Sequence, residues 1–214
     1  MHRARATACV GLGVLAGALV VGCNIVTPIA YAVHGPGRVK AQYKLNPEAT
    51  TVVFIDDPAN KVSQRRLRAE IGQSAQETLL AKKVVGDMID TRAALTASSK
   101  DRHGKMLSTQ EIGEAVGADV VIWGLLSEFT LSADGVSNMP TASLQVKVMD
   151  VATGETWPPG DEFYPLSVTL GQRPGYAPRS TSARLEGEAE LAKRLGVGLA
   201  QLFYNHDVTE SVRR

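Results

Sequence analysis

The 214-residue chain is poor in cysteine, and its two cysteines, Cys9 and Cys23, both lie in the N-terminal segment. The body that follows Cys23 therefore contains no thiol. This excludes disulfide frameworks, thiolate metal sites and cysteine nucleophiles from the body. A body without thiols also suits an oxidising compartment, where free thiols react.

Aromatic residues and excess charge are scarce as well. Phe, Trp and Tyr together make up 5% of the chain, which is too few for the stacking platforms that bind bases or sugars. The formal net charge of +1 gives no electrostatic reason to expect a nucleic-acid partner. Apolar residues at 44% and charged residues at 21% are typical of a globular protein with a packed core.

The N-terminus combines a basic start with a long uncharged run. Residues 6–21 carry no charge, and they follow Arg3 and Arg5. A basic start and an apolar run of this kind are typical of a secretory signal. The sequence therefore predicts that the chain is exported.

The end of this run resembles the bacterial lipoprotein signal. Val20-Val21-Gly22-Cys23 matches its pattern of an aliphatic residue, a small residue, Gly or Ala, and Cys, although Val21 is bulkier than usual. The resemblance implies that residues 1–22 are a cleaved signal peptide and that Cys23 is lipidated. Several acyl chains on one residue would anchor the protein stably, so the lipid bilayer is an expected partner.

Two other interpretations of the N-terminal segment remain open. The uncharged run continues to Val33, which is long enough to cross a bilayer, although Asn24, Thr27 and Pro28 weaken this interpretation. Alternatively, Ala30-Tyr31-Ala32 is a small-x-small site for ordinary signal cleavage after Ala32. We favour lipidation over both.

Hydrophobic patterning predicts one α/β domain over residues 49–206, after a lipidated tether at 23–48 and before a tail at 207–214. The expected order β-α-β-α-β-β-β-α describes a sandwich in which helices pack on a mixed sheet. Strands are expected at 50–55, 82–85, 118–131 and 142–150 and in one extended stretch made of 156–157 and 163–170, and helices are expected at 59–81, 108–117 and 183–205. Residues 93–105 are expected to be polar and irregular.

Titratable residues offer few candidate sites. Asp56 and Asp57 follow a central strand at its carboxyl end, where α/β proteins often place ligand sites. Two adjacent carboxylates could bind a cation, but ahead of Pro58 we favour turn and helix-cap roles for them. His34, His103 and His206 are interpreted as surface histidines outside any metal site.

Two features are candidates for contact with a partner. Arg65 and Arg66, with Arg68, give the first helix a basic face, which is most simply a solvated surface and alternatively a contact for an acidic partner or anionic head groups. Trp157, next to Pro158, is expected to be an exposed aromatic side chain. The candidate partner-binding residues are therefore Trp157, Arg65 and Arg66.

Two patterned stretches carry a resemblance to a known group of proteins. Gly117-Ala118-Asp119 leads into a strand that reaches Gly124, and a later strand ends in Asp150-Val151-Ala152-Thr153-Gly154-Glu155. These motifs resemble periplasmic lipoproteins of the curli-secretion and penicillin-binding-protein-activator group, and the N-terminal domain of the Tol-system propeller protein. The resemblance implies an α/β domain that works through protein contacts in the cell envelope without catalysis. It transfers no functional residue to this chain.

We therefore expect a membrane-anchored, non-catalytic scaffold or regulator of an envelope assembly, with no cofactor and with unidentified envelope proteins as partners. It would face the periplasm. Asn24 after the lipidated cysteine favours the outer membrane over the inner one. An oligomeric secretion or channel component, and an envelope enzyme that uses Asp56 or Asp57 with a metal, are the alternatives.

Overall fold

The computed structural model describes residues 37–99, 106–171 and 177–207. The signal, Cys23, His34 and His103 lie outside these residues. Two very short strands, β1 (Arg38–Val39) and β8 (His206–Asp207), form a small sheet of their own. Residues 39–206 form a compact unit built around a second, larger sheet.

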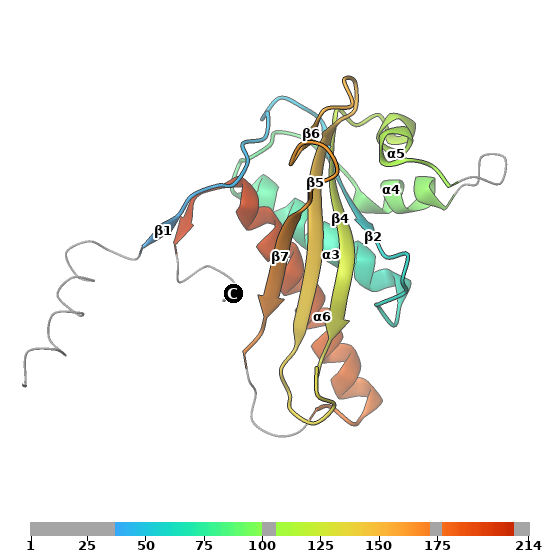
Figure 1. Cartoon of the computed structure of the whole chain (residues 1–214), viewed down its shortest axis with the longest axis vertical. Helices are drawn as coiled ribbons and strands as arrows, with labels where there is room; N and C mark the ends of the chain where they lie inside the picture. Colours follow the sequence, from blue (N-terminus) through green and yellow to red (C-terminus); the bar gives the residue numbers. More distant parts are fainter. Residues whose placement is uncertain (1–36, 100–105, 172–176, 208–214) are drawn as a thin grey trace, which may run out of the picture. The chain divides into compact units, whose positions relative to one another are not determined.

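The larger sheet has six strands, and β4 lies in its middle between β2 and β5 (Figure 1). Its strands are β2 (Thr51–Asp56), β3 (Met88–Ile89), β4 (Val120–Thr130), β5 (Thr141–Asp150), β6 (Thr156–Trp157) and β7 (Tyr164–Thr169). β2 is parallel to β3 on one side and to β4 on the other. β5 is antiparallel to β4, and β6 and β7 are antiparallel to β5 at different ends of it. The predicted α/β class with a mixed sheet is confirmed.

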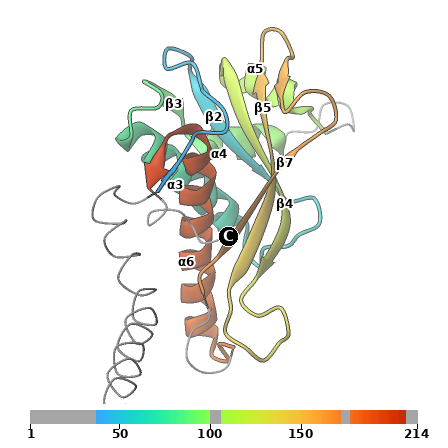
Figure 2. The same ribbon diagram turned by 60° about the vertical axis from the view of Figure 1, so that its left-hand side comes forward.

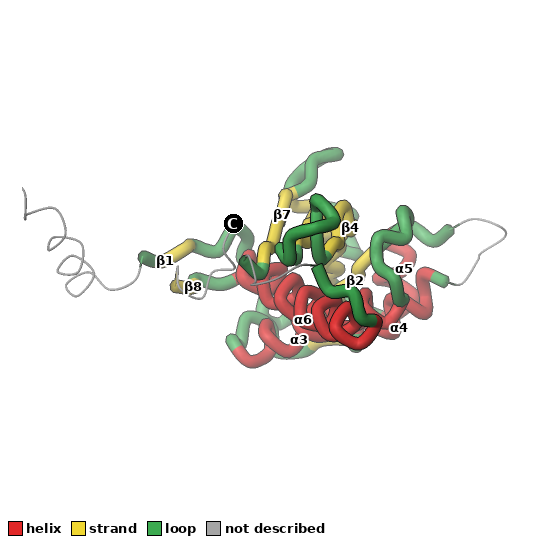
Figure 3. The backbone as a smooth tube through the Cα atoms, turned by 90° about the horizontal axis from the view of Figure 1, so that it is seen from below, coloured by secondary structure: helices red, strands yellow, loops and turns green. Residues whose placement is uncertain are grey.

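In the described part of the chain, four helices and a short 3₁₀ turn accompany the sheet. They are α3 (Arg65–Ala81), α4 (Thr91–Ser98), α5 (Thr109–Val116), α6 (Thr181–Ala200) and η1 (Gln201–Phe203). α3 and α6 lie side by side under one face of the sheet (Figures 2 and 3). Among the described residues, no helix is both long enough and apolar enough to cross a membrane.

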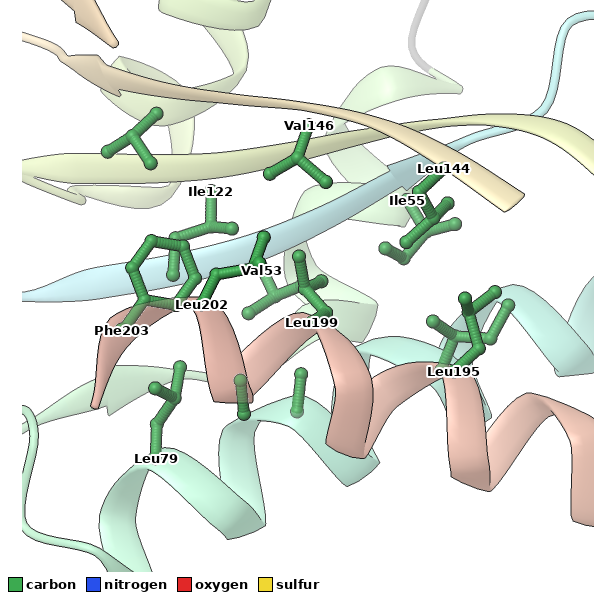
Figure 4. Close-up of a cluster of buried hydrophobic side chains, with 14 of the residues drawn as sticks. Val53, Ile55, Leu79, Ile122, Leu144, Val146, Leu195, Leu199, Leu202 and Phe203 are labelled. Atoms are coloured by element: carbon green, nitrogen blue, oxygen red, sulfur yellow. The ribbon is translucent and has the colours of Figure 1, made fainter. Parts of the chain in front are cut away.

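The face toward α3 and α6 carries the main hydrophobic core. Val53 and Ile55 of β2 meet Leu195 and Leu199 of α6, and all four side chains are fully buried (Figure 4). The two helices approach very closely, because a Cβ atom added at Gly196 would lie 2.3 Å from the Ile71 carbonyl oxygen. Period-two alternation in β2 and helical spacing in α3 and α6 together produce this core.

The opposite face is covered only in part. Val52 and Phe54 of β2 pack against Ala94 of α4 and Ile112 of α5, in a second and smaller cluster. Away from these helices the face is polar: Ser143 of β5, for example, hydrogen-bonds Ser167 of β7 through the hydroxyls at 2.9 Å.

Between the covered and the polar parts of this face, Lys147 contacts the loop that contains Gly160 and Phe163. Lys147 of β5 is only 5% exposed, and its Nζ donates to the Gly160 carbonyl at 2.5 Å. The same Nζ lies 4.5 Å from the centroid of the Phe163 ring, which in turn packs edge-on against Trp123. The buried cation is therefore held by a carbonyl and an aromatic face.

β7 lies at an edge of the sheet, and Pro165 lies at one of its positions where the backbone nitrogen is directed away from the neighbouring strand β5. The Leu170 amide donates to the Pro140 carbonyl, so the amides of Tyr164, Leu166 and Val168 face β5 in the same register. Pro165 occupies a position whose amide would point away from the sheet. Proline is found at such edge positions because it has no N–H to leave unpaired.

The motifs that carry the family resemblance are turn and cap residues. Gly117 ends α5 with a φ of +74°, and the Asp119 carboxylate accepts the Thr50 amide at 2.8 Å. In the later motif, the Asp150 carboxylate accepts both the amide and the hydroxyl of Thr153. These bonds lower the pKa of Asp150. Each of these residues fixes the path of the backbone.

The start of α3 differs from the prediction of a helix from residue 59. Asp57 accepts the amides of Lys61 and Val62, and Asn60 has a φ of +51°. This turn holds residues 57–62 out of helical geometry, so α3 begins at Arg65.

The expected strand at 82–85 is wrong, and residues 93–98, expected to be irregular, are helical; residues 100–105 of that segment lie outside the described residues. Lys83 has a φ of +54° and the Val84 amide bonds the Leu79 carbonyl, so these residues close the end of α3, and the strand is Met88–Ile89. Asp90 then accepts the Arg92 amide and starts α4.

Two further segments are more buried than the sequence indicates. His206, expected on the surface, is 7% exposed and lies against Tyr204. Residues 39–48, assigned by sequence to the tether, contribute Leu45 to the main core at 4% exposure. The Gln42 amide of this segment donates to the Leu202 carbonyl at 2.7 Å.

Candidate functional site

A cleft of about 940 Å³ opens at the carboxyl end of β2, on the face that carries α4 and α5. This volume lies in the upper range for ligand pockets. The carboxyl ends of parallel strands are also where α/β sheets commonly bind ligands, because the connecting segments diverge there. The floor is apolar, and Phe54, Leu95, Ile112 and Trp123 contribute to it.

Asp56, the last residue of β2, is paired within the fold. Its Oδ1 lies 3.8 Å from Nη2 of Arg68, and both side chains are largely shielded, at 24% and 20% exposure. The Arg68 Nε also donates to the Ile55 carbonyl at 2.8 Å. Burial lowers the pKa of Arg68, and Asp56 opposes this shift. Arg68 therefore points into the structure, although the sequence placed it on the solvated face of the helix.

Asp57 is also committed to the backbone. Its Oδ1 accepts the Lys61 amide at 2.8 Å, and its Oδ2 accepts the Val62 amide at 3.1 Å. This is the turn role that we favoured for Asp57. Because Asp57 uses both oxygens for amides and Asp56 faces a cation, neither carboxylate is prepared for a metal ion. No group of three or more potential metal ligands occurs among the described residues.

The cationic rim of the cleft has two exposed members, Arg65 and Arg92. Arg65 is the first residue of α3, and Arg92 lies in the first turn of α4. Arg92 Nη2 makes a long hydrogen bond of 3.4 Å to the Gln73 side chain. Neither arginine has a carboxylate partner in the part of the chain that the structure describes.

The wall formed by α5 begins with a capping box. Ser108 accepts the Glu111 amide, and the Glu111 carboxylate accepts the Ser108 amide at 2.8 Å. The sequence predicts this cap, and it is confirmed. Ser108 and Gln110 of this first turn line the cleft.

Of the predicted partner-binding residues, only Arg65 lies at the cleft. Arg66, its neighbour, instead pairs with Glu70 along α3 at 3.1 Å. Trp157 lies elsewhere, half-buried between the rings of Tyr43 at 5.1 Å and Tyr164 at 5.5 Å. These contacts make Trp157 part of an aromatic cluster, and its role in partner binding stays a prediction.

The sequence interpretation missed Arg92 and the floor residue Trp123 as parts of one site. Arg92 lies between the expected strand at 82–85 and the segment at 93–105 expected to be irregular, and it was assigned to no element, whereas Trp123 was assigned to the core. Trp123 is half-buried, and its indole Nε1 has no hydrogen-bond acceptor among the described residues. The Asp90 cap ahead of Arg92 is the signal that could have revealed α4.

No protein-family model matches the chain, and no curated protein matches it. Solved structures similar to it include the PelC dodecamer from Paraburkholderia phytofirmans, at 15% identity and a TM-score of 0.39, covering 78% of this chain and 96% of that one. Lipoprotein GNA1162 from Neisseria meningitidis matches at 12% identity and a TM-score of 0.37, over 64% of this chain and 90% of that one.

The LpoB C-terminal domain from Salmonella enterica matches at 16% identity and a TM-score of 0.34, over 58% of this chain and 85% of that one. The matched structures thus include a lipoprotein. At these values the likeness is distant, and no property of these proteins is transferred to this chain.

Proposed function

We propose that this protein is a lipid-anchored lipoprotein of the bacterial cell envelope, and that its α/β domain acts without catalysis as a scaffold or regulator of an envelope assembly. The observation that carries this proposal is Val20-Val21-Gly22-Cys23 after a basic start and an uncharged run. The absence of thiols from the rest of the sequence agrees with export.

The anchor has a direct test. The full-length protein is expressed in a bacterium with a labelled fatty acid, and its labelling and membrane association are compared with those of Cys23→Ser. We expect label on the wild type alone and release of Cys23→Ser from the membrane fraction after signal cleavage. A labelled Cys23→Ser protein, or an unlabelled wild type, would contradict lipidation. An inhibitor of the lipoprotein signal peptidase should cause the uncleaved wild type to accumulate.

Fractionation of the same cells can determine which membrane holds the lipidated protein. Asn24 follows Cys23, and we propose that the protein is held in the outer membrane and faces the periplasm. Separation of inner and outer membranes on a density gradient should place the labelled protein in the outer-membrane fraction. Replacement of Asn24 by Asp, an inner-membrane retention signal known in some bacteria, should move it to the inner membrane.

The non-catalytic role is supported by the contacts of Asp56 and Asp57. A metal-dependent enzyme would need these two carboxylates as ligands, but both already have partners within the fold. Asp57 caps a turn and Asp56 faces Arg68. Crosslinking in the native envelope, followed by mass spectrometry, should capture a defined partner protein at a reproducible site on residues 39–206. A hydrolase or transferase activity that survives purification and is lost in a folded Asp57→Asn variant would overturn the non-catalytic proposal.

A further inference from the structure

The cleft beside β2 has an uncompensated positive rim. Of its two acidic residues, Asp56 faces Arg68 and Asp57 accepts backbone amides, so neither forms an ion pair with Arg65 or Arg92, and the three arginines of the lining outnumber the two carboxylates. Arg65 and Arg92 are both exposed at the cleft, and neither has an acidic partner in the described residues. The cleft therefore presents two cations above an apolar floor.

The positions of these arginines in their helices are themselves unfavourable. Arg65 and Arg92 lie in the first turns of α3 and α4, where the free amides and the helix dipole create positive potential. A cation there is unfavourable. The start of α3 has neither a side-chain cap nor an acidic residue in its first turn, whereas the Asp90 carboxylate caps the start of α4. An anion bound at the rim would be stabilised by both guanidinium groups, and the uncapped start of α3 would add to this.

The apolar floor and the wide mouth of the cleft indicate what else the ligand must carry besides negative charge. Leu95 and Trp123 offer half-buried apolar surface next to the buried Phe54 and Ile112. A segment of extended chain with an apolar side chain fits an open cleft with such a floor, since the backbone can run across the mouth. Contacts of this kind, with a buried apolar anchor and charged pairs at the rim, are typical of protein interfaces.

We infer that this cleft binds an acidic peptide segment of a partner protein, with an apolar side chain against Leu95 and Trp123 and carboxylates paired with Arg65 and Arg92. This inference rests on the proposed function, because it names the surface and the chemistry through which the domain would contact its assembly. Rim charges act mainly on the rate of association and on the choice of partner.

The test is selection from a random peptide-display library on the full-length protein, held in nanodiscs of neutral phosphatidylcholine. The variant Arg65→Glu/Arg92→Glu serves for counter-selection. We expect the enriched peptides to combine Asp or Glu with Leu, Phe or another large apolar residue. Their dissociation constants should rise at least about tenfold on the charge-reversed variant and less on Arg65→Lys/Arg92→Lys. Added salt should weaken binding to the wild type.

A matched control separates local charge from net charge. Lys40→Glu/Lys193→Glu makes the same change in total charge at exposed positions that do not line the cleft. This control should bind the enriched peptides as the wild type does, and thermal unfolding should show that all variants are folded.

Three outcomes would overturn the inference: no enrichment, enrichment of peptides without acidic residues, or equal binding by the charge-reversed variant. Binding of phosphatidylglycerol vesicles that requires Arg65 and Arg92, without peptide enrichment, would assign the rim to anionic lipid instead. Any of these results leaves fatty-acid labelling of Cys23 and crosslinking of the domain intact, so failure of this inference is distinguishable from failure of the proposed function.

Discussion

The two faces of the large sheet differ in how completely they are covered. Under one face, α3 and α6 run side by side and bury an apolar layer that includes Val53, Ile55 and Leu199. On the other face, α4 and α5 cover only the strands around Phe54, a cleft opens beside them, and the part over β5 and β7 carries polar side chains such as Ser143 and Ser167. The first face accounts for the stability of the fold. The second leaves surface available for contacts, and the following predictions test this division.

The largest expected effect is truncation in the fully covered face. Leu199→Ala removes a side chain with 0% exposure and leaves a cavity, so we expect a loss of about 3 to 4 kcal/mol in unfolding free energy. Leu95→Ala, at the half-buried cleft floor, should cost about 1 kcal/mol. Urea denaturation of both variants measures the difference. Equal losses would show that the two faces contribute alike.

The next effect comes from the close contact of α3 and α6. In Gly196→Ala the new Cβ would lie 2.3 Å from the Ile71 carbonyl oxygen and 2.9 Å from the Ala75 amide nitrogen, and neither backbone atom can move without separating the helices. We expect a loss of about 2 to 3 kcal/mol.

Gly187→Ala is the control on the same helix. Its Cβ would meet the flexible end of the Leu131 side chain at 3.3 Å, and alanine is the better helix former. This variant should therefore be at least as stable as the wild type in the same denaturation experiment. A neutral Gly196→Ala would contradict the close helix contact.

A smaller effect is expected at the wall of the partly covered face. Ser108→Ala removes the cap that accepts the Glu111 amide at the start of α5, and we expect a loss of about 1 kcal/mol. Ser108→Thr should retain most of the stability, because its hydroxyl can accept the same bond. If Ser108→Ala and Ser108→Thr unfold at the same urea concentration, the cap does not stabilise α5.

The smallest effect concerns the turn after β5, which belongs to neither face. Hydrogen bonds from Thr153 lower the pKa of Asp150 below its unfolded value of about 3.9. The stabilisation by Asp150 is therefore complete well above pH 4 and is lost as the pH falls through the folded pKa. The difference in urea midpoint between wild type and Asp150→Asn should shrink between about pH 5 and pH 2. A difference that stays constant over this range would contradict the role of the charged carboxylate.

Regular and locally encoded features of this fold were predictable from the sequence. The apolar run of β2, the alternation in β5 and the capping box at Ser108 each depend on neighbouring residues, and the structure confirms all three. Short elements were not predictable in the same way. Val84 and Val85 have the composition of a strand, but they close the end of α3, because tertiary packing decides the state of so short a segment.

The cleft could be predicted only in part. Asp56 was correctly placed at the carboxyl end of a central strand, where sites are common. Arg65, Arg92 and Trp123 come from three separate segments, and only the parallel pairing of β2 with its neighbours brings those segments together. The pairing of Asp56 with Arg68 also depends on the three-dimensional path, since the sequence pattern placed Arg68 in solvent.

Pro165 limits the ways in which copies of this protein can join. A second chain laid along the outer side of β7 would find the amides of Ser167 and Thr169 but none at Pro165, so a regular ladder could not extend over the whole strand. At the opposite border of the sheet, β3 is only two residues long. Within the described residues, a ring or filament of this protein could not be built on an uninterrupted backbone ladder along β7. Contacts between copies that depend on side chains can be strengthened or weakened by single substitutions. The backbone hydrogen bonds of a continuous intermolecular sheet would be much less sensitive to such substitutions.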